Sequence, residues 1–223
     1  MMDLLQSSGA TPVRLSVQSH SDDIRALIKS SDKVITNQKM RNSFTKMHFD
    51  TPKIYGQVKL HKPGRPLHPV IAVFSYPSLF LARYLCSWFL TFSAFEPKHS
   101  LKNSFDLTEQ LKGLHIPPGA RLVSFDVKSM YTCIPVPETI GIMCDLLSKQ
   151  SIDDCVTSEL KKLLNQCLKR NIWSYRGRTY EFPGGLPMGG LLSALVAEVY
   201  MFSLEDQILS FPSSPPSSFG PDI

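Results

Sequence analysis

The sequence has little cysteine and lacks a long uninterrupted hydrophobic run. Its five cysteines are odd in number and lack the Cys-x-x-Cys spacing of zinc sites and redox pairs, so we expect reduced thiols. Pro77 and Arg83 interrupt the most apolar stretch, residues 70–95, which favours a buried helix over a membrane span. Residues 1–10 hold no basic segment ahead of an apolar run, so no secretory signal is expected. These features predict an intracellular protein of the nucleus or cytoplasm, without a membrane partner.

The signatures of several enzyme classes are also absent. The six histidines do not form the His-Glu-x-x-His pair of zinc hydrolases, and no serine stands in a Gly-x-Ser-x-Gly elbow. Gly184 and Gly189 have the glycine spacing of a P-loop, but Gly190 and Leu191 stand where that motif needs Lys and Ser or Thr. The sequence therefore does not support a hydrolase.

The composition is that of a folded chain with one large domain, or one domain and an appendage. Of its 223 residues, 43% are hydrophobic and 19% are charged, which is too apolar for general disorder. The formal net charge is +5, and the charges are unevenly distributed. Residues 53–102 contain seven basic residues and one acid, whereas residues 103–223 contain ten basic residues and thirteen acids. This asymmetry is typical of a nucleic-acid-binding face, although a solvated basic face would leave the same pattern.

Hydrophobic periodicity and turn residues predict an α+β fold in which helices back a sheet. Helices are expected over residues 21–30, 79–92 and 191–209, after the cap Asn103, and around the apolar stripes 140–147 and 156–167. β-Hairpins are expected over residues 53–73, with Lys62-Pro-Gly-Arg65 at the tip, and over 172–182, with the turn Arg176-Gly177. Residues 121–127 alternate as a strand that ends near Asp126.

Two further features are interpreted as structural. Asp22-Asp23 and Asp153-Asp154 each precede an amphipathic segment and are interpreted as helix caps, because acids favour the first turn of a helix. Leu107 and Leu111 are expected to form the inner stripe of the helix after Asn103.

The chain divides into three parts. Residues 1–50 are mixed in character, and the sequence assigns them no chemistry. Residues 51–209 contain the hairpins and most of the helices. Residues 210–223 are rich in Ser and Pro and are expected to be disordered.

Three features are candidates for chemistry. Asp126 ends an apolar strand, where a Mg²⁺ ligand of nucleotidyl transfer would lie, although helix capping is the alternative. Tyr131, five residues later, is a candidate for the floor of the same cleft or for packing under the sheet. The glycines of residues 184–190 allow backbone N–H groups to approach a phosphate or a base, although a simple strand-to-helix turn would also explain them.

Four motifs follow one another along residues 53–209. They are Tyr55-Gly-Gln-Val-Lys-Leu-His-Lys-Pro-Gly-Arg-Pro-Leu-His-Pro69, Asn103-Ser-Phe-Asp106, Leu122-Val-Ser-Phe-Asp-Val-Lys-Ser-Met-Tyr-Thr-Cys-Ile-Pro135, and Gly185-Leu-Pro-Met-Gly-Gly-Leu-Leu-Ser193 with Tyr200-Met201. In this order they resemble the fingers hairpin, the block after it, motif A and motif B of the reverse transcriptases of Penelope-like retroelements.

The resemblance implies a partial right-hand polymerase fold, with fingers and an incomplete palm, that acts in RNA-directed DNA synthesis. Its partners would be an RNA template, a DNA primer and dNTPs, and its cofactor would be Mg²⁺, with Mn²⁺ as a substitute. Asp126 and the Val127 carbonyl would bind the metal, and the ring of Tyr131 would exclude a ribose 2′-OH. The other nucleotide-binding residues would be Lys62, Arg65, Gly185, Met188 and Gly189. Lys53, Lys59 and Lys62 would contact nucleic acid.

The sequence departs from the family in two ways that bear on activity. Glu198 places a negative charge where the family commonly has Asn, near the path of the nucleic acid. The aromatic-x-Asp-Asp motif that completes the two-metal site is not present, because the acids after Met201 are Glu205, Asp206 and Asp222. We therefore expect a truncated or frameshifted copy that is catalytically incomplete. The alternatives are a nucleic-acid-binding remnant and an inert fragment.

Overall fold

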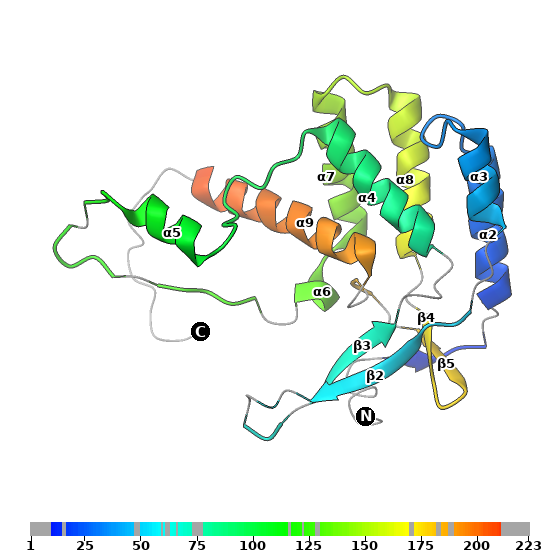
Figure 1. Cartoon of the computed structure of the whole chain (residues 1–223), viewed down its shortest axis with the longest axis horizontal. Coiled ribbons are helices and arrows are strands. Elements are labelled where there is room, and N and C mark those ends of the chain that lie inside the picture. Colours follow the sequence, from blue (N-terminus) through cyan, green and yellow to red (C-terminus); the bar gives the residue numbers. More distant parts are fainter. Residues whose placement is uncertain are drawn as a thin grey trace.

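The chain forms an α+β structure, as the sequence predicts. A computed structural model describes residues 10–14, 17–46, 50–58, 60, 63–65, 67–72, 78–115, 117–121, 123–127, 130–169, 172–181, 184–186 and 190–210. Within these residues there are eight helices and one mixed sheet of five strands. Most of the helices pack together in one layer, and the sheet lies beside their ends (Figure 1).

The helices follow the sequence pattern closely. Their bounds are α2 Val17–Ser30, α3 Gln38–Thr45, α4 Leu79–Ser93, α5 Ser104–Leu111, α6 Met130–Cys133, α7 Val136–Lys149, α8 Asp154–Leu168 and α9 Leu191–Ser210. Asn103 caps α5, since its side-chain oxygen accepts hydrogen bonds from the N–H groups of Phe105 and Asp106. Asp153 caps α8 in the same way, through the N–H group of Cys155. Ser210 therefore belongs to a helix, and the rest of the tail lies outside the described residues.

The prediction of a cap at Asp22-Asp23 was wrong. Helix α2 begins at Val17, so Asp22 lies inside the helix. Its carboxylate accepts hydrogen bonds from the side chains of Gln18 and Arg25, one turn before and one turn after it. Such pairs stabilise an acid within a helix, so an acidic dipeptide does not by itself mark a helix start.

The apolar stretch around residues 70–95 divides between the sheet and α4. Leu81, Leu85 and Phe89 of α4 are fully buried in the core. Among the residues that the structure describes, no helix is both long and apolar enough to cross a membrane.

Two hairpins and a short strand make up the sheet. The strands are β1 Thr11–Pro12, β2 Lys53–Val58, β3 Leu67–Ala72, β4 Ile172–Tyr175 and β5 Arg178–Glu181, in the order β1-β5-β4-β2-β3. Both predicted hairpins form. The β4–β5 hairpin has a two-residue turn, and its residues Arg176 and Gly177 have the left-handed backbone that such turns require, with φ of 49° and 76°. The hairpins meet in parallel where Lys53 of β2 pairs with Ser174 of β4.

The main core lies between the helices and includes the N-terminal part of the chain. The predicted apolar stripes of α7 and α8 are buried in it, through Ile140, Met143, Leu147, Leu160, Leu163, Leu164 and Cys167. Residues 1–50, to which the sequence assigns no chemistry, supply Ile24, Ile28, Val34 and Ile35. The N-terminal helices are thus an integral part of the helical layer.

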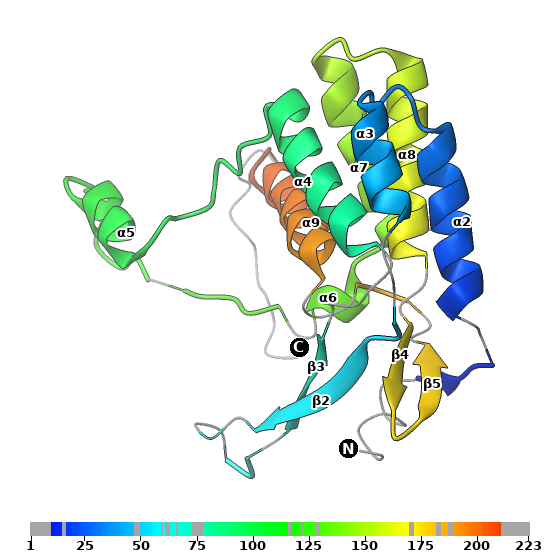
Figure 2. The same cartoon turned by 45° about the vertical axis from the view of Figure 1, so that its right-hand side comes forward.

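The sheet has a small hydrophobic cluster of its own. Ile54 faces Ile71 across β2 and β3, and Trp173 stacks on Tyr180 across β4 and β5 with ring centroids 4.9 Å apart. These cross-strand pairs stabilise the hairpins directly. Figures 1 and 2 show the sheet beyond the ends of α4 and α8, so the helices flank it at an edge instead of backing one face as predicted.

Residues 98–127 project from the helical layer as an arm that contains α5 (Figures 1 and 2). The predicted strand over residues 121–127 is wrong, because the described residues of this segment form no strand and are exposed. The prediction that Leu107 and Leu111 form an inward-facing apolar stripe on α5 is also wrong, since both residues are exposed. A strand exists only when a neighbour accepts its hydrogen bonds, and no described strand pairs with this segment.

Candidate functional site

Two of the four motifs meet at Tyr131 and Gly185. Gly185 has a φ of +72°, and a Cβ on it would lie 2.6 Å from the Thr132 Cα and 2.7 Å from the Tyr131 carbonyl oxygen. The next residue, Leu186, donates its N–H to the same Tyr131 carbonyl at 2.7 Å. Only glycine combines this backbone conformation with so close an approach. The fold therefore joins the glycine loop at Gly185 to α6.

A small cavity adjoins this contact. It has a volume of about 300 Å³ and lies between α6 and α9, lined by Met130, Tyr131, Ala194, Ala197, Glu198 and Met201. The two alanines of α9 leave room beside the half-buried Tyr131, and Glu198 is the one acid among the described lining residues. Glu198, which departs from the family pattern in the sequence, thus lines the same cavity as Tyr131, whose ring the resemblance places under the sugar.

Asp126 lies on the arm, on exposed and irregular backbone. Val127 is also largely exposed, and α6 begins three residues further on, at Met130. The carboxylate is therefore close in sequence to Tyr131 but is not held by a sheet. The strand predicted to position it is not formed, so its direction is not fixed by hydrogen bonds to neighbouring strands.

The described residues do not form a complete site for a divalent metal. Within these parts of the chain, no group of three or more His, Cys, Asp or Glu side chains is close enough to hold an ion. Mg²⁺ sites usually use one or two carboxylates together with substrate phosphates, and two-metal sites need more. Asp126 and the Val127 carbonyl as Mg²⁺ ligands therefore remain a prediction from the resemblance.

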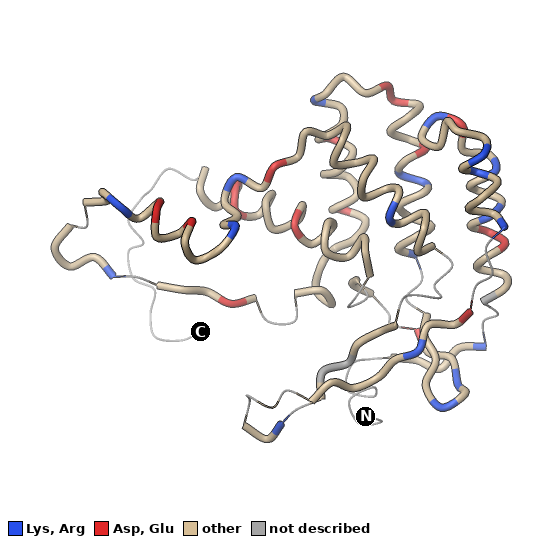
Figure 3. The backbone as a smooth tube through the Cα atoms, viewed as in Figure 1, with Lys and Arg blue, Asp and Glu red and all other residues tan. Residues whose placement is uncertain are grey.

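The basic hairpin is the second predicted contact surface. Lys53 is exposed on β2, and Arg65 is exposed at the tip, with a φ of 43° next to Gly64 at 72°. Figure 3 shows that the charged residues drawn on this hairpin are Lys and Arg. Lys59 and Lys62, like Met188 and Gly189 of motif B, lie outside the described residues. The hairpin tip points away from α6 in both cartoon views.

No protein-family model matches this sequence, and no curated protein matches it.

The cysteines differ in burial: Cys167 is buried, whereas Cys133 and Cys155 are exposed. All five are free of disulfides. Burial raises the pKa of Cys86 to about 11, and it raises the pKa of Cys167 still further. Since the thiolate is the reactive form, neither residue is a nucleophile at neutral pH.

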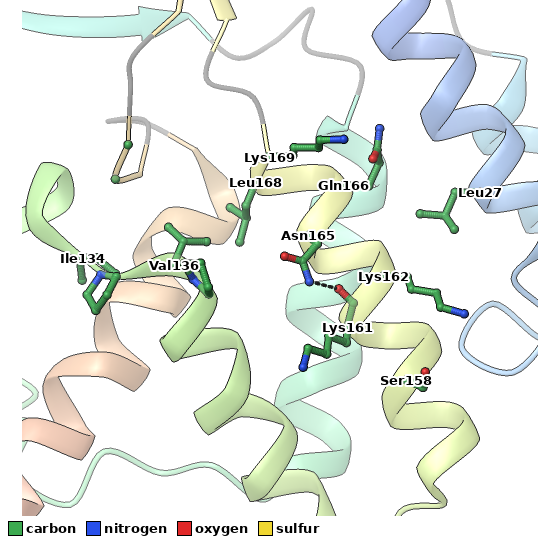
Figure 4. A pocket seen from close by; sticks show the side chains of 14 residues that line it. Leu27, Ile134, Val136, Ser158, Lys161, Lys162, Asn165, Gln166, Leu168 and Lys169 are labelled. Carbon is green, nitrogen blue, oxygen red and sulfur yellow. Dashed lines mark hydrogen bonds between the residues drawn. The ribbon is translucent and has the colours of Figure 1, made fainter. Parts of the chain in front are cut away.

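A second, larger hollow was not predicted from the sequence. It has a volume of about 970 Å³ and lies along α8, next to Gly184 and Gly185 (Figure 4). Its basic lining residues are Lys161, Lys162 and Lys169. The sequence does contain a clue to this basic surface. Residues 160–169 carry these three lysines and no acid, although the C-terminal region as a whole has a negative net charge.

Proposed function

We propose that this chain is the fingers and part of the palm of a reverse transcriptase related to those of Penelope-like retroelements. The observation that supports this is the contact of Gly185 and Leu186 with Tyr131 and Thr132. The resemblance assigns these two segments to one nucleotide pocket, although 54 positions separate Tyr131 from Gly185. Direct backbone contact between the two segments is what a shared pocket would require.

In this proposal the contact orients Tyr131. Its carbonyl is held by the N–H of Leu186, and the missing Cβ of Gly185 lets the loop lie against α6. The half-buried ring lies beside the cavity lined by Ala194, Ala197 and Glu198. A ring fixed there would discriminate against a 2′-OH on the sugar of an incoming nucleotide.

The chain by itself is proposed to bind nucleic acid without adding nucleotides. Two-metal phosphoryl transfer requires several carboxylates, and within the described residues Asp126 has no such partners. Exposed Lys53 and Arg65, with Lys59 and Lys62 in the same hairpin, supply charge for phosphate contacts. An RNA–DNA hybrid is the expected ligand, because the family copies an RNA template onto a DNA primer.

The first test measures binding of a labelled RNA–DNA hybrid by fluorescence anisotropy at several salt concentrations. We expect salt-dependent binding by the unaltered chain. The double variant Lys62→Ala and Arg65→Ala is expected to lower the salt slope by about two, since each phosphate contact contributes about 0.9. The control, Lys29→Ala with Lys39→Ala, removes equal charge from exposed sites on α2 and α3. An unchanged slope in the hairpin variant would contradict the proposed surface.

A second test locates the primer terminus. A hybrid with a photoreactive nucleotide at the primer 3′ end is expected to crosslink to residues 126–131 or 184–201. Crosslinks confined to other parts of the chain would reject the assignment to this family. Primer extension with Mg²⁺ and dNTPs is expected to yield no product, and extension that Asp126→Ala abolishes would overturn the non-catalytic half of the proposal.

A further inference from the structure

A groove along the outward face of α8 has three charged side chains among its described lining residues, and all three are lysines. Leu27 of α2 stands on one side of it, and residues 134–137 at the start of α7 stand on the other (Figure 4). Its charged lining residues are Lys161, Lys162 and Lys169, all exposed. The opposite face of α8 is buried in the helical core, so the lysine face is the one presented to solvent.

The acids of α8 do not neutralise this groove. Asp154 lies in the first turn of the helix, away from the three lysines in sequence. Glu159 is engaged elsewhere, because its carboxylate accepts hydrogen bonds from the backbone N–H groups of Lys33 and Val34. None of the described residues that line the groove is an acid. A hollow lined by charge of one sign concentrates ligands of the opposite sign.

The arrangement of the lysines suits an extended polyanion better than a compact one. Figure 4 shows Lys161 and Lys162 pointing to opposite sides of α8, so they do not converge on one point. Lys162 and Lys169 are seven residues apart, which is about 10 Å along a helix axis. That distance is about three nucleotides of a stacked strand at roughly 3.4 Å each.

The remaining lining residues are of the kind that contact the sugar-phosphate backbone of a nucleic acid and not its bases. The side-chain Nε2 of Gln166 is buried and has no hydrogen-bond partner among the described residues. The walls are apolar at Ile134, Val136 and Leu168, and among the described residues the lining includes no aromatic ring on which a base would stack. Contacts of this kind hold phosphates and do not read sequence.

We propose that this groove binds a single strand of nucleic acid through its phosphates. The inference rests on the proposed function and deepens it, since Gly184 and Gly185 line the groove while Gly185 also touches Thr132 of the candidate site. The strand follows α8 past the glycine loop, so the groove is a track for nucleic acid separate from the basic hairpin.

The test uses the whole chain and a labelled single-stranded RNA of arbitrary sequence. The variant Lys161→Gln, Lys162→Gln, Lys169→Gln is expected to lower the salt slope by about two, because each contact to a single strand contributes about 0.7. At about 0.1 M salt this corresponds to roughly a hundredfold weaker binding. The matched control, Lys29→Gln, Lys39→Gln, Lys149→Gln, removes the same charge from exposed positions on α2, α3 and α7 and is expected to bind normally.

A footprint on the unaltered chain makes the result independent of any folding defect. Acetylation of Lys161, Lys162 and Lys169, read by mass spectrometry, is expected to slow when single-stranded RNA is bound, while Lys39 and Lys149 react at an unchanged rate. If the groove variant and the control bind RNA equally, or if bound RNA does not slow acetylation of the three lysines, the proposal that this groove binds nucleic acid is wrong. Neither result would affect the test of the basic hairpin. Equal protection by duplex DNA or heparin overturns the single-strand assignment, and absence of any binding contradicts the proposed function as well.

Discussion

Glu159 of α8 accepts a hydrogen bond from the backbone N–H of Val34 at 2.8 Å, across 125 positions of sequence. The carbonyl of the same Val34 accepts a hydrogen bond from the hydroxyl of Tyr84 on α4 at 2.6 Å. Both polar groups of one backbone residue are thus held by side chains from other helices. These bonds fasten the loop between α2 and α3 to the helical core and help to form one unit from residues that are distant in sequence.

Removing the Glu159 carboxylate is expected to destabilise the chain. Glu159→Ala leaves the N–H groups of Lys33 and Val34 without their acceptor, at a cost of about 1–3 kcal/mol in the free energy of unfolding. Urea denaturation followed by circular dichroism measures this change. Asp145→Ala, at an exposed position of α7, is the control and is expected to change stability by less than about 0.5 kcal/mol. Equal stability of the two variants would contradict the role assigned to Glu159.

Gly185 and its neighbour Gly184 are expected to respond differently to substitution. Gly185→Ala places a Cβ against the Thr132 backbone at a positive φ, which is expected to cost about 1–3 kcal/mol and to displace α6. A Cβ on Gly184 meets no atom within 4 Å, so Gly184→Ala serves as the control and is expected to be mild. Thermal unfolding measures both. If Gly184→Ala is as damaging as Gly185→Ala, the contact is not what requires glycine.

The arm is expected to contribute little to global stability despite its apolar residues. Phe125 is 94% exposed, so Phe125→Ser is expected to change the free energy of unfolding by less than about 0.5 kcal/mol. Phe89 of α4 is fully buried, and Phe89→Ala is expected to cost about 3–5 kcal/mol. Chemical denaturation of the two variants gives the comparison. A large loss for Phe125→Ser would mean that the arm packs against the body.

Stability is expected to fall in alkaline solution partly because of Cys86. Burial raises the pKa of its thiol from about 9 to about 11. In the unfolded chain the thiol loses its proton near pH 9, whereas in the folded chain it keeps the proton until about pH 11. Ionisation therefore favours the unfolded state as the pH rises through this window, and it has no effect at lower pH.

Melting temperatures of the unaltered chain and of Cys86→Ala test this expectation. The decline between pH 9 and about pH 11 is expected to be shallower in the variant. It is not expected to vanish, because burial also raises the pKa values of Cys144, Cys167 and Tyr84. Identical declines would show that Cys86 does not couple to folding.

The local elements of the chain were determined by the sequence alone. The apolar stripes of α7 and α8, the cap at Asn103 and the turn at Arg176-Gly177 were all predicted, and the structure confirms them. These features depend on residues within one or two turns of each other, so periodicity and capping suffice to find them. The contact between the segments of Tyr131 and Gly185 does not follow from local pattern, because spacing along the chain does not reveal which loops meet.

The tertiary structure alone decided what those elements are used for. Residues 121–127 have the alternation of a strand, yet they lie exposed, since a strand forms only when a neighbour completes its hydrogen bonds. The contact of Gly185 with Thr132 and the bond from Val34 to Glu159 join distant segments, as does the groove beside α8. Such contacts depend on which surfaces face each other after packing. They are therefore determined by residues throughout the chain and cannot be read from any one short segment of the sequence.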